Sequence, residues 1–270
     1  MVTHQRPAFL LIPGLLAIAF LLIPLLAILG EAPLDSFANI ITSPSARAAL
    51  QLSLITSLIA TAFATLVGAP LAWLLSRDAL PATRLIRALV IVPRLLPPGG
   101  SGVGLLTAIG RRSLIGGWIY DSTGWQLPFS TAGVVVAEAF VAMPFLIITL
   151  EGAFRYQDRE VEEAAAIDGA NPRQIFSKIT LPLVGPALLA GITLTWARAI
   201  GEFGATITFA GNLEGTTQTM PLAVYAALES DRDTAIALSV TLLVVAVAIL
   251  VSLRGYYLPG RTNKLAAQRQ

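Results

Sequence analysis

The stretch Glu163–Pro182, EAAAIDGANPRQIFSKITLP, is a polar and charged island in an otherwise apolar chain, and it is typical of two short helices around a glycine corner. Asp158 precedes the first helix and is placed to accept a hydrogen bond from one of its unpaired amides. Acidic residues follow in the opening turns, where the helix dipole favours negative charge: Glu160, Glu162 and Glu163. Gly169 fits the left-handed position that commonly ends a helix.

A second short helix is expected directly after that corner. Asn171 and Pro172 are an N-cap and first-turn pair, because proline has no amide hydrogen to leave unpaired there. We expect Leu181 and Pro182 to end this helix before the next apolar run. The stretch therefore predicts a helix, a corner and a second helix.

The composition indicates a membrane protein. The chain has 270 residues, of which 55% are hydrophobic and 13% are charged, and its mean hydropathy is +0.75. A soluble domain carries roughly 25% charged residues, so the membrane is the expected solvent. The net charge of +2 is too small to indicate nucleic-acid binding.

The residue inventory excludes several kinds of chemistry. The chain has no cysteine, and its single histidine, His4, lies at the terminus. Neither of its lysines, Lys178 and Lys264, closes a phosphate-binding loop of the GxxxxGK[ST] type. We therefore expect no metal site, no cofactor and no catalytic residues, and if ATP drives this protein, another polypeptide binds the ATP.

Six apolar segments are long enough to cross roughly 30 Å of hydrocarbon at about 1.5 Å per residue. They lie near residues 8–29, 48–76, 85–110, 131–152, 183–210 and 234–253. The first is too long for a signal peptide and is interpreted as a retained helix. The third carries prolines and glycines between Pro93 and Gly100 that must kink or break it, either as a packing kink or as part of a pore lining.

The placement of basic residues predicts the orientation. With the N-terminus in the cytoplasm, the inner segments are 1–7, 77–84, 153–182 and 254–270. Twelve basic residues lie there or at the inner boundary: Arg6, Arg77, Arg84, Arg87, Arg155, Arg159, Arg173, Lys178, Arg254, Arg261, Lys264 and Arg269. The outer loops hold four: Arg47, Arg111, Arg112 and Arg232. This bias predicts that both termini and the Glu163–Pro182 stretch are cytoplasmic.

Ionisable and small residues gather near the end of the fifth apolar segment. Arg198 and Glu202 are four residues apart and can meet on one helix face. They form either a structural pair, with pairing of Arg198 to Glu138 as a further option, or part of a pore. Thr206 and Thr208, with nearby glycines, permit either close helix packing or a widened path. Arg94 and Arg198 are the only basic candidates at membrane depth, so we expect no dense basic cluster on the path.

The 155–182 loop resembles the coupling loop of a permease subunit of an ABC importer, through the pattern Glu-Ala-Ala, three residues, Gly, nine residues, Ile-x-Leu-Pro. The matching positions are Glu163, Ala164, Ala165, Gly169, Ile179, Leu181 and Pro182. The resemblance implies an all-α fold of the type I importer permeases, with six transmembrane helices in one domain, 1–270, and cytoplasmic coupling helices. It also implies two copies of an ATPase subunit as partners, and transport by alternating access.

A second resemblance, over roughly residues 45–255, is to molybdate-type ABC permeases, relatives of the sulfate and thiosulfate permeases. It rests on the run from Gly201 to Asn212, on Thr219–Tyr225, on Gly124–Phe129 and on Met143–Phe145. It implies a permease homodimer in a bacterial cytoplasmic membrane and an extracytoplasmic oxyanion-binding protein. Arg94 and the stretch Pro98–Ser101 depart from the family pattern, so the resemblance does not predict the course of the third segment.

The favoured function is the membrane subunit of an ATP-driven molybdate importer, with tungstate, sulfate or thiosulfate as alternative substrates. An autonomous secondary transporter is a second function class, but no inverted repeat is apparent between the two halves. A membrane-embedded enzyme would need clustered titratable residues at depth, and only Glu138 and Glu202 are candidates.

Overall fold

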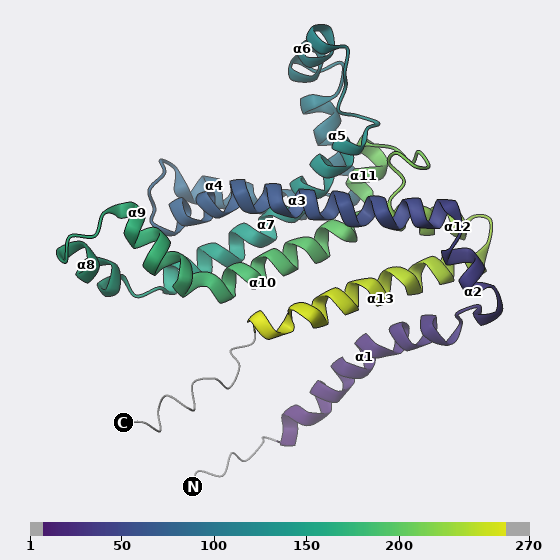
Figure 1. The fold of residues 1–270 in the computed structure, drawn as a ribbon, viewed down its shortest axis with the longest axis horizontal. Coiled ribbons are helices and arrows are strands. Elements are labelled where there is room, and N and C mark those ends of the chain that lie inside the picture. The colour runs from purple at the N-terminus through teal and green to yellow at the C-terminus, as the bar shows by residue number, and fades with distance from the viewer. Residues whose placement is uncertain (1–7, 258–270) are drawn as a thin grey trace.

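The computed structural model describes the backbone of residues 8–257 and the side chains of residues 9–252. Its elements are η1 Ala8–Leu10, α1 Leu11–Gly30, α2 Leu34–Ile41, α3 Pro44–Ser76, α4 Thr83–Leu95, α5 Pro98–Ile109, α6 Leu114–Thr123, α7 Thr131–Tyr156, α8 Arg159–Ile167, α9 Pro172–Ile175, the π-helical turn η2 Phe176–Thr180, α10 Leu181–Ile200, α11 Gly204–Phe209, α12 Met220–Leu228 and α13 Arg232–Tyr257 (Figure 1). Over this range the chain is helical without strands, which confirms the all-α prediction. His4, Arg6, Arg261, Lys264 and Arg269, and the side chain of Arg254, lie outside the described residues.

The core forms where α7 packs between α3 and α10. On α3 the buried face consists mostly of small residues at helical spacing, among them Ala49, Ala60, Ala64 and Ala72. Small side chains let two helix backbones approach closely, which is the usual basis of packing in a bilayer. At Gly68 an added Cβ would lie 3.2 Å from the side chain of Ile147, so this contact has little room for a larger residue.

The predicted membrane segments correspond to observed helices. Within residues 8–257, five helices are long and apolar enough to cross a membrane, and a sixth crossing results if α4 and α5 are taken together. Figure 1 shows α1 beside α13 and away from the core. Large apolar side chains are exposed all along α1, as expected for a surface that contacts lipid or another chain.

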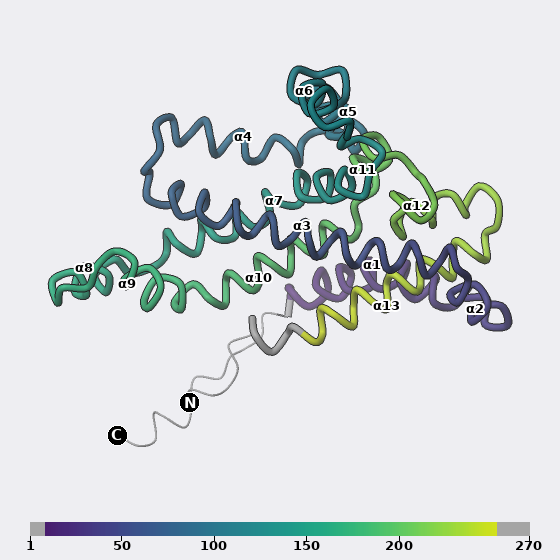
Figure 2. Tube along the Cα trace, turned by 45° about the horizontal axis from the view of Figure 1, so that its top comes forward, coloured from purple at the N-terminus to yellow at the C-terminus, as the bar shows by residue number. Residues whose placement is uncertain are grey.

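The third segment is broken, as the prolines predicted. Helix α4 ends at Leu95, α5 begins at Pro98, and the two axes differ in direction by 118°. In both views α5 and α6 project from one side of the main bundle (Figures 1 and 2), and α5 packs on α11 at its base. Pro98 occupies the first turn of α5, where its missing amide hydrogen costs nothing.

The fifth segment departs from the prediction of one helix over residues 183–210. Helix α10 ends at Ile200, and the short helix α11 follows after Gly201–Phe203. The Glu202 carboxylate accepts a hydrogen bond from the Ala205 amide, 2.8 Å away, which satisfies one of the unpaired donors of a new helix start. The Glu202 side chain thus stabilises the start of α11 after the break.

Candidate functional site

The first half of the 155–182 loop folds as the sequence predicted. Asp158 accepts a hydrogen bond from the Glu160 amide at 3.0 Å and caps α8. Gly169 has a φ of +88° and closes the helix. The amides of Gly169 and Ala170 bond to the carbonyls of Ala166 and Ala165, at 3.1 and 3.0 Å, in the pattern of a Schellman motif.

The second half begins as predicted but does not end where it was expected to end. Asn171 and Gln174 form a reciprocal capping box, with Pro172 in the first turn. Leu181 and Pro182 do not stop the helix, because α9 continues through the π-helical turn η2 directly into α10. A π turn widens the helix and makes room for the Pro182 ring, which would otherwise clash with a carbonyl four residues earlier. Residues Pro172–Ile200 thus form one helical rod of 29 residues.

The surface of α8 is open to a partner. Glu163 and Ala164 are exposed, Ala165 is half-buried, and Ile167 is 85% exposed. In η2 and α10 the matching residues Ile179, Leu181 and Pro182 are half-buried or exposed. Figure 1 shows α8 and α9 together at one end of the long axis of the molecule, opposite α2 and α12.

Glu162 connects this loop to the body. Its carboxylate accepts hydrogen bonds from Arg77 Nη2 at 2.7 and 2.8 Å, directly after the end of α3. It also accepts hydrogen bonds from the side-chain amide of Gln157, Nε2, at 3.1 Å and from the Thr180 hydroxyl at 2.6 Å. The Arg77 and Glu162 side chains are each only 16% exposed. We call Arg77, Gln157, Glu162 and Thr180 the Glu162 clamp; it joins α3, α8 and η2.

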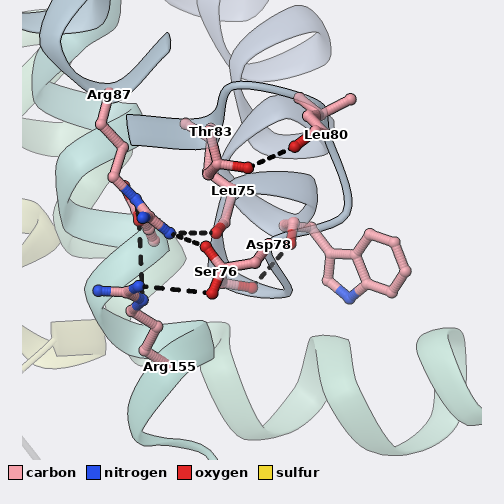
Figure 3. A network of polar contacts seen from close by, with 9 residues as sticks. Leu75, Ser76, Asp78, Leu80, Thr83, Arg87 and Arg155 are labelled. Atoms are coloured by element: carbon pink, nitrogen blue, oxygen red, sulfur yellow. Dashed lines mark hydrogen bonds and ion pairs between the residues drawn. The ribbon is translucent and has the colours of Figure 1, made fainter. Parts of the chain in front are cut away.

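A second polar network fixes the neighbouring helix ends. Arg87 of α4 donates to Glu151 at 2.5 Å, to the Leu75 carbonyl at 2.6 Å and to Asp78 at 2.8 Å. Figure 3 shows Arg87 and Arg155 pointing toward Asp78 in the turn after α3. These contacts fasten α3, α4 and α7 together at the end of the molecule that carries the loop.

At membrane depth, Arg198 pairs with Glu202 rather than with Glu138. Arg198 Nη2 lies 2.5 Å from Glu202 Oε2, and Glu202 is buried. Glu138 is also buried, and it accepts a hydrogen bond from the Thr56 hydroxyl at 2.9 Å. Of the two pairings open from the sequence, the structure contains the self-neutralising pair.

A pocket of about 270 Å³ lies beside this pair, at the break between α4 and α5. Arg94, Ser101, Phe145, Arg198 and Glu202 contribute to its wall. The two basic residues at membrane depth, which the sequence places more than a hundred positions apart, therefore line the same cavity. Arg94 also lies over the Phe145 ring, with 4.5 Å between its guanidinium carbon and the ring centroid.

The predicted threonines are in packed positions. Thr206 is fully buried. Thr208 packs against α5, where a Cβ added to Gly102 would lie 2.5 Å from its Cβ, and its hydroxyl donates to the Gly204 carbonyl at 2.9 Å. In this conformation Thr208 serves the contact between α5 and α11, and the buried Thr206 hydroxyl has no hydrogen-bond partner among the described residues.

Sequence reasoning missed the roles of Arg77, Arg87 and Ser101. Arg77 and Arg87 entered only as positive charges on the inner side, and their partners Glu162 and Glu151 are 85 and 64 residues away in the chain. A search for acidic residues on the same predicted side would have suggested Glu151 and Glu162. Ser101 gives no sequence signal beyond its place after the Pro–Gly break.

Comparison with known proteins decides the family. The family described as "Binding-protein-dependent transport system inner membrane component" matches residues 65–264. The chain is 41% identical to the molybdenum transport system permease protein ModB of Mycobacterium tuberculosis, over 91% of this chain and 92% of the relative. The ModB protein of Escherichia coli K12 is 37% identical, over 78% and 92%. This chain belongs to the family of binding-protein-dependent transport permeases.

Other relatives place this permease within a wider group. The sulfate transport system permease protein CysT of Escherichia coli K12 is 33% identical, over 86% of this chain and 85% of the relative. Among solved structures, a bacterial ABC transporter involved in alginate import aligns with a TM-score of 0.73 at 17% identity, over 92% of this chain and 93% of that chain. That likeness shows the fold, which is the one expected for an importer permease. The permease is thus a multi-pass protein of the cytoplasmic membrane.

Proposed function

We propose that this permease carries molybdate across the cytoplasmic membrane, driven by ATP hydrolysis in a separate subunit. The observation that carries the proposal is the 41% identity to a molybdenum permease over 91% of the chain. Tungstate is a second candidate substrate because of its similar chemistry. Sulfate and thiosulfate are weaker candidates, supported by the 33% identity to a sulfate permease.

The proposed machine contains two copies of the permease, two ATPase subunits and an extracytoplasmic binding protein. A bacterial alginate ABC transporter that shares this fold has been solved in complex with an alginate pentasaccharide-bound periplasmic protein, which supports the binding-protein partner. The positive-inside bias supports cytoplasmic termini and a cytoplasmic 155–182 loop. An autonomous secondary transporter would give that loop no task.

The coupling loop acts mechanically. The exposed face of α8, with Glu163, Ala164 and Ile167, docks on the ATPase. Gly169 sets the corner. Residues Ile179, Leu181 and Pro182 lie where the loop continues into α10, so movement of the docked loop tilts α10 as a lever.

The test is uptake in vesicles. The permease is co-purified with its ATPase and binding protein, reconstituted, and supplied with labelled molybdate with and without ATP. We expect ATP-dependent uptake that tungstate inhibits and sulfate inhibits weakly. Uptake by the permease alone without ATP would contradict the importer, and preferential uptake of sulfate would move the proposal to the alternative substrate.

A further inference from the structure

The pocket at the break between α4 and α5 lies level with the middle of α7, a helix long and apolar enough to span a membrane. Phe145, on its wall, is 14 residues from the start of α7 at Thr131 and 11 from its end at Tyr156. At about 1.5 Å per residue, these separations are about 21 Å and about 17 Å. A break in a helix at membrane depth is tolerated only where it is buried in protein or lines an aqueous cavity. The break between α4 and α5 adjoins a polar pocket.

The charges around the pocket favour an anion. Two guanidinium groups, of Arg94 and Arg198, face one carboxylate, that of Glu202. Glu202 neutralises Arg198 through the 2.5 Å ion pair. Arg94 has no acidic partner among the described residues and is held only over the Phe145 ring. The pocket therefore carries one uncompensated positive charge, and isolated charges at membrane depth usually mark a functional path.

Ser101 supplies an independent observation. The residue is 2% exposed and lies on the pocket wall. Its hydroxyl makes no hydrogen bond within the part of the chain that the structure describes. Its oxygen is not sealed in the core but borders the open space of the pocket, where a ligand or water can reach it. The hydroxyl is thus a free donor beside two guanidinium groups, in the first turn of α5, where the helix dipole also favours negative charge.

We propose that this pocket is a transit site for a tetrahedral oxyanion, which Arg94, Arg198 and Ser101 bind and which Glu202 keeps from binding too tightly. The identity of the anion rests on the proposed function. The volume of about 270 Å³ is that of about nine waters at roughly 30 Å³ each, which leaves room for an oxyanion and part of its hydration shell.

Glu202 explains how the site releases its ligand. Conduction requires a site attractive enough to enter and weak enough to leave. The Ala205 amide holds Glu202 Oε1 at 2.8 Å, so the carboxylate stays beside Arg198 and competes with the anion for it. When the anion leaves, the Arg198–Glu202 pair forms again and Arg198 does not remain as an unpaired charge in the membrane.

The first test measures binding of labelled molybdate to the full-length permease co-purified with its ATPase, without the binding protein. We expect Arg94→Gln to weaken binding about ten- to a hundredfold, as for loss of a hydrogen bond between charged groups. Arg111→Gln is the matched control, because Arg111 also stacks on a ring, that of Tyr120 at 3.8 Å, and lies away from the pocket. Its affinity should stay within about twofold of wild type.

Glu202→Gln gives a change of opposite sign. The amide oxygen of glutamine can still accept the Ala205 hydrogen bond, while the competing charge is gone. We expect binding about tenfold tighter and a lower maximal rate of uptake in reconstituted vesicles, because the anion leaves more slowly. A purely structural ion pair would instead lower expression of Glu202→Gln and leave molybdate affinity unchanged, which would contradict the proposal.

The absence of cysteine from the 270 residues allows a second measurement that does not depend on Arg94. Ser101→Cys should react with an anionic methanethiosulfonate reagent, and molybdate or tungstate should slow the reaction at least about fivefold if it occupies the pocket. Ser57→Cys is the control, because Ser57 is 0% exposed and is hydrogen-bonded to Trp196. It should not react.

The outcomes separate this proposal from the proposed function. Wild-type uptake of molybdate combined with unchanged binding in Arg94→Gln and no protection of Ser101→Cys would overturn the transit site and leave the importer standing. Absence of ATP-driven oxyanion uptake by the wild-type complex would overturn the proposed function, and the transit site with it.

Discussion

At the scale of single residues, Gly169 is the position where the coupling proposal is most sensitive. Its φ of +88° lies in the left-handed region, while an added Cβ would meet nothing within 4 Å. Substitution is therefore costly through backbone strain, of about 1–3 kcal/mol, and not through collision. We expect Gly169→Val to insert normally but to hydrolyse ATP with little molybdate uptake, measured as the ratio of transport to ATPase activity in proteoliposomes.

Asparagine is the control for this position. It tolerates the left-handed conformation much better than valine, so Gly169→Asn should retain most of the coupling. Equal transport by Gly169→Val and wild type would show that the corner does not transmit motion.

Glu138 is the second residue whose behaviour can be predicted. It is 1% exposed, one of its oxygens accepts from Thr56 at 2.9 Å, and the other has no hydrogen-bond partner within the described part of the chain. A carboxyl group buried without an ion-pair partner is costly to keep ionised. Glu138→Gln keeps an acceptor for Thr56, so we expect a thermal midpoint equal to or higher than that of wild type in detergent. A fall of several degrees would show that the protein depends on the charge.

At the scale of elements, the Glu162 clamp should make α3, α8 and η2 move together. A double-mutant cycle with Arg77→Gln and Glu162→Gln isolates the central pair, and contacting residues typically couple by about 0.5–3 kcal/mol. We expect a value in the upper half of that range, because both side chains are only 16% exposed. The measurement is thermal or denaturant unfolding of the purified permease.

The control cycle uses Arg232→Gln and Glu31→Gln. That ion pair is 73% and 55% exposed, and such pairs typically contribute about 0–1 kcal/mol. The Arg77–Glu162 coupling should also persist at high salt, whereas the exposed pair should lose most of its own coupling. Equal coupling energies in the two cycles would mean that the Arg77–Glu162 pair contributes no more to stability than an exposed ion pair.

Local elements were predictable because their causes are local. The Asp158 cap, the Gly169 corner and the Asn171–Pro172 start are each set by a few adjacent residues. The helix end predicted at Leu181–Pro182 was wrong because a π-helical turn accommodates the Pro182 ring and the helix continues. Nothing in the local sequence pattern distinguishes such a turn from a helix end.

The pocket residues were only half predictable. Arg94 and Arg198 could be identified as unusual, since arginine is rare at membrane depth. Their convergence depends on the 118° break after Leu95 and on the place where α10 ends, which are tertiary outcomes. The same holds for the Arg77–Glu162 pair, whose members are 85 residues apart.

At the scale of the whole molecule, one continuous helical element joins the two candidate sites. The rod Pro172–Ile200 begins in the coupling loop and carries Arg198 near its other end. Its 29 residues span about 43 Å at about 1.5 Å each. Arg94 belongs to α4, which Arg87 fastens to α3 and α7. Because the Glu162 clamp ties the start of the rod to α3, displacement of the loop would move the rod and that block together, and we expect the anion pocket, which lies at the break between α4 and α5, to respond to the state of the ATPase.

This linkage requires the loop and the α6 region to lie on opposite sides of the membrane, and the absence of cysteine allows a direct test. Ser177 in η2 and Ser122 in α6 are a matched pair. Both are exposed, and each donates a 2.7 Å hydrogen bond to the carbonyl four residues earlier.

In right-side-out vesicles a membrane-impermeant maleimide should label Ser122→Cys and spare Ser177→Cys, and in inside-out vesicles the pattern should reverse. Docked ATPase should protect Ser177→Cys, whose neighbours form the coupling loop, and removal of the ATPase should restore labelling. Labelling of both positions from the same side would break the mechanical link between motor and pocket, because the loop could not then face the cytoplasm while α6 faces outward.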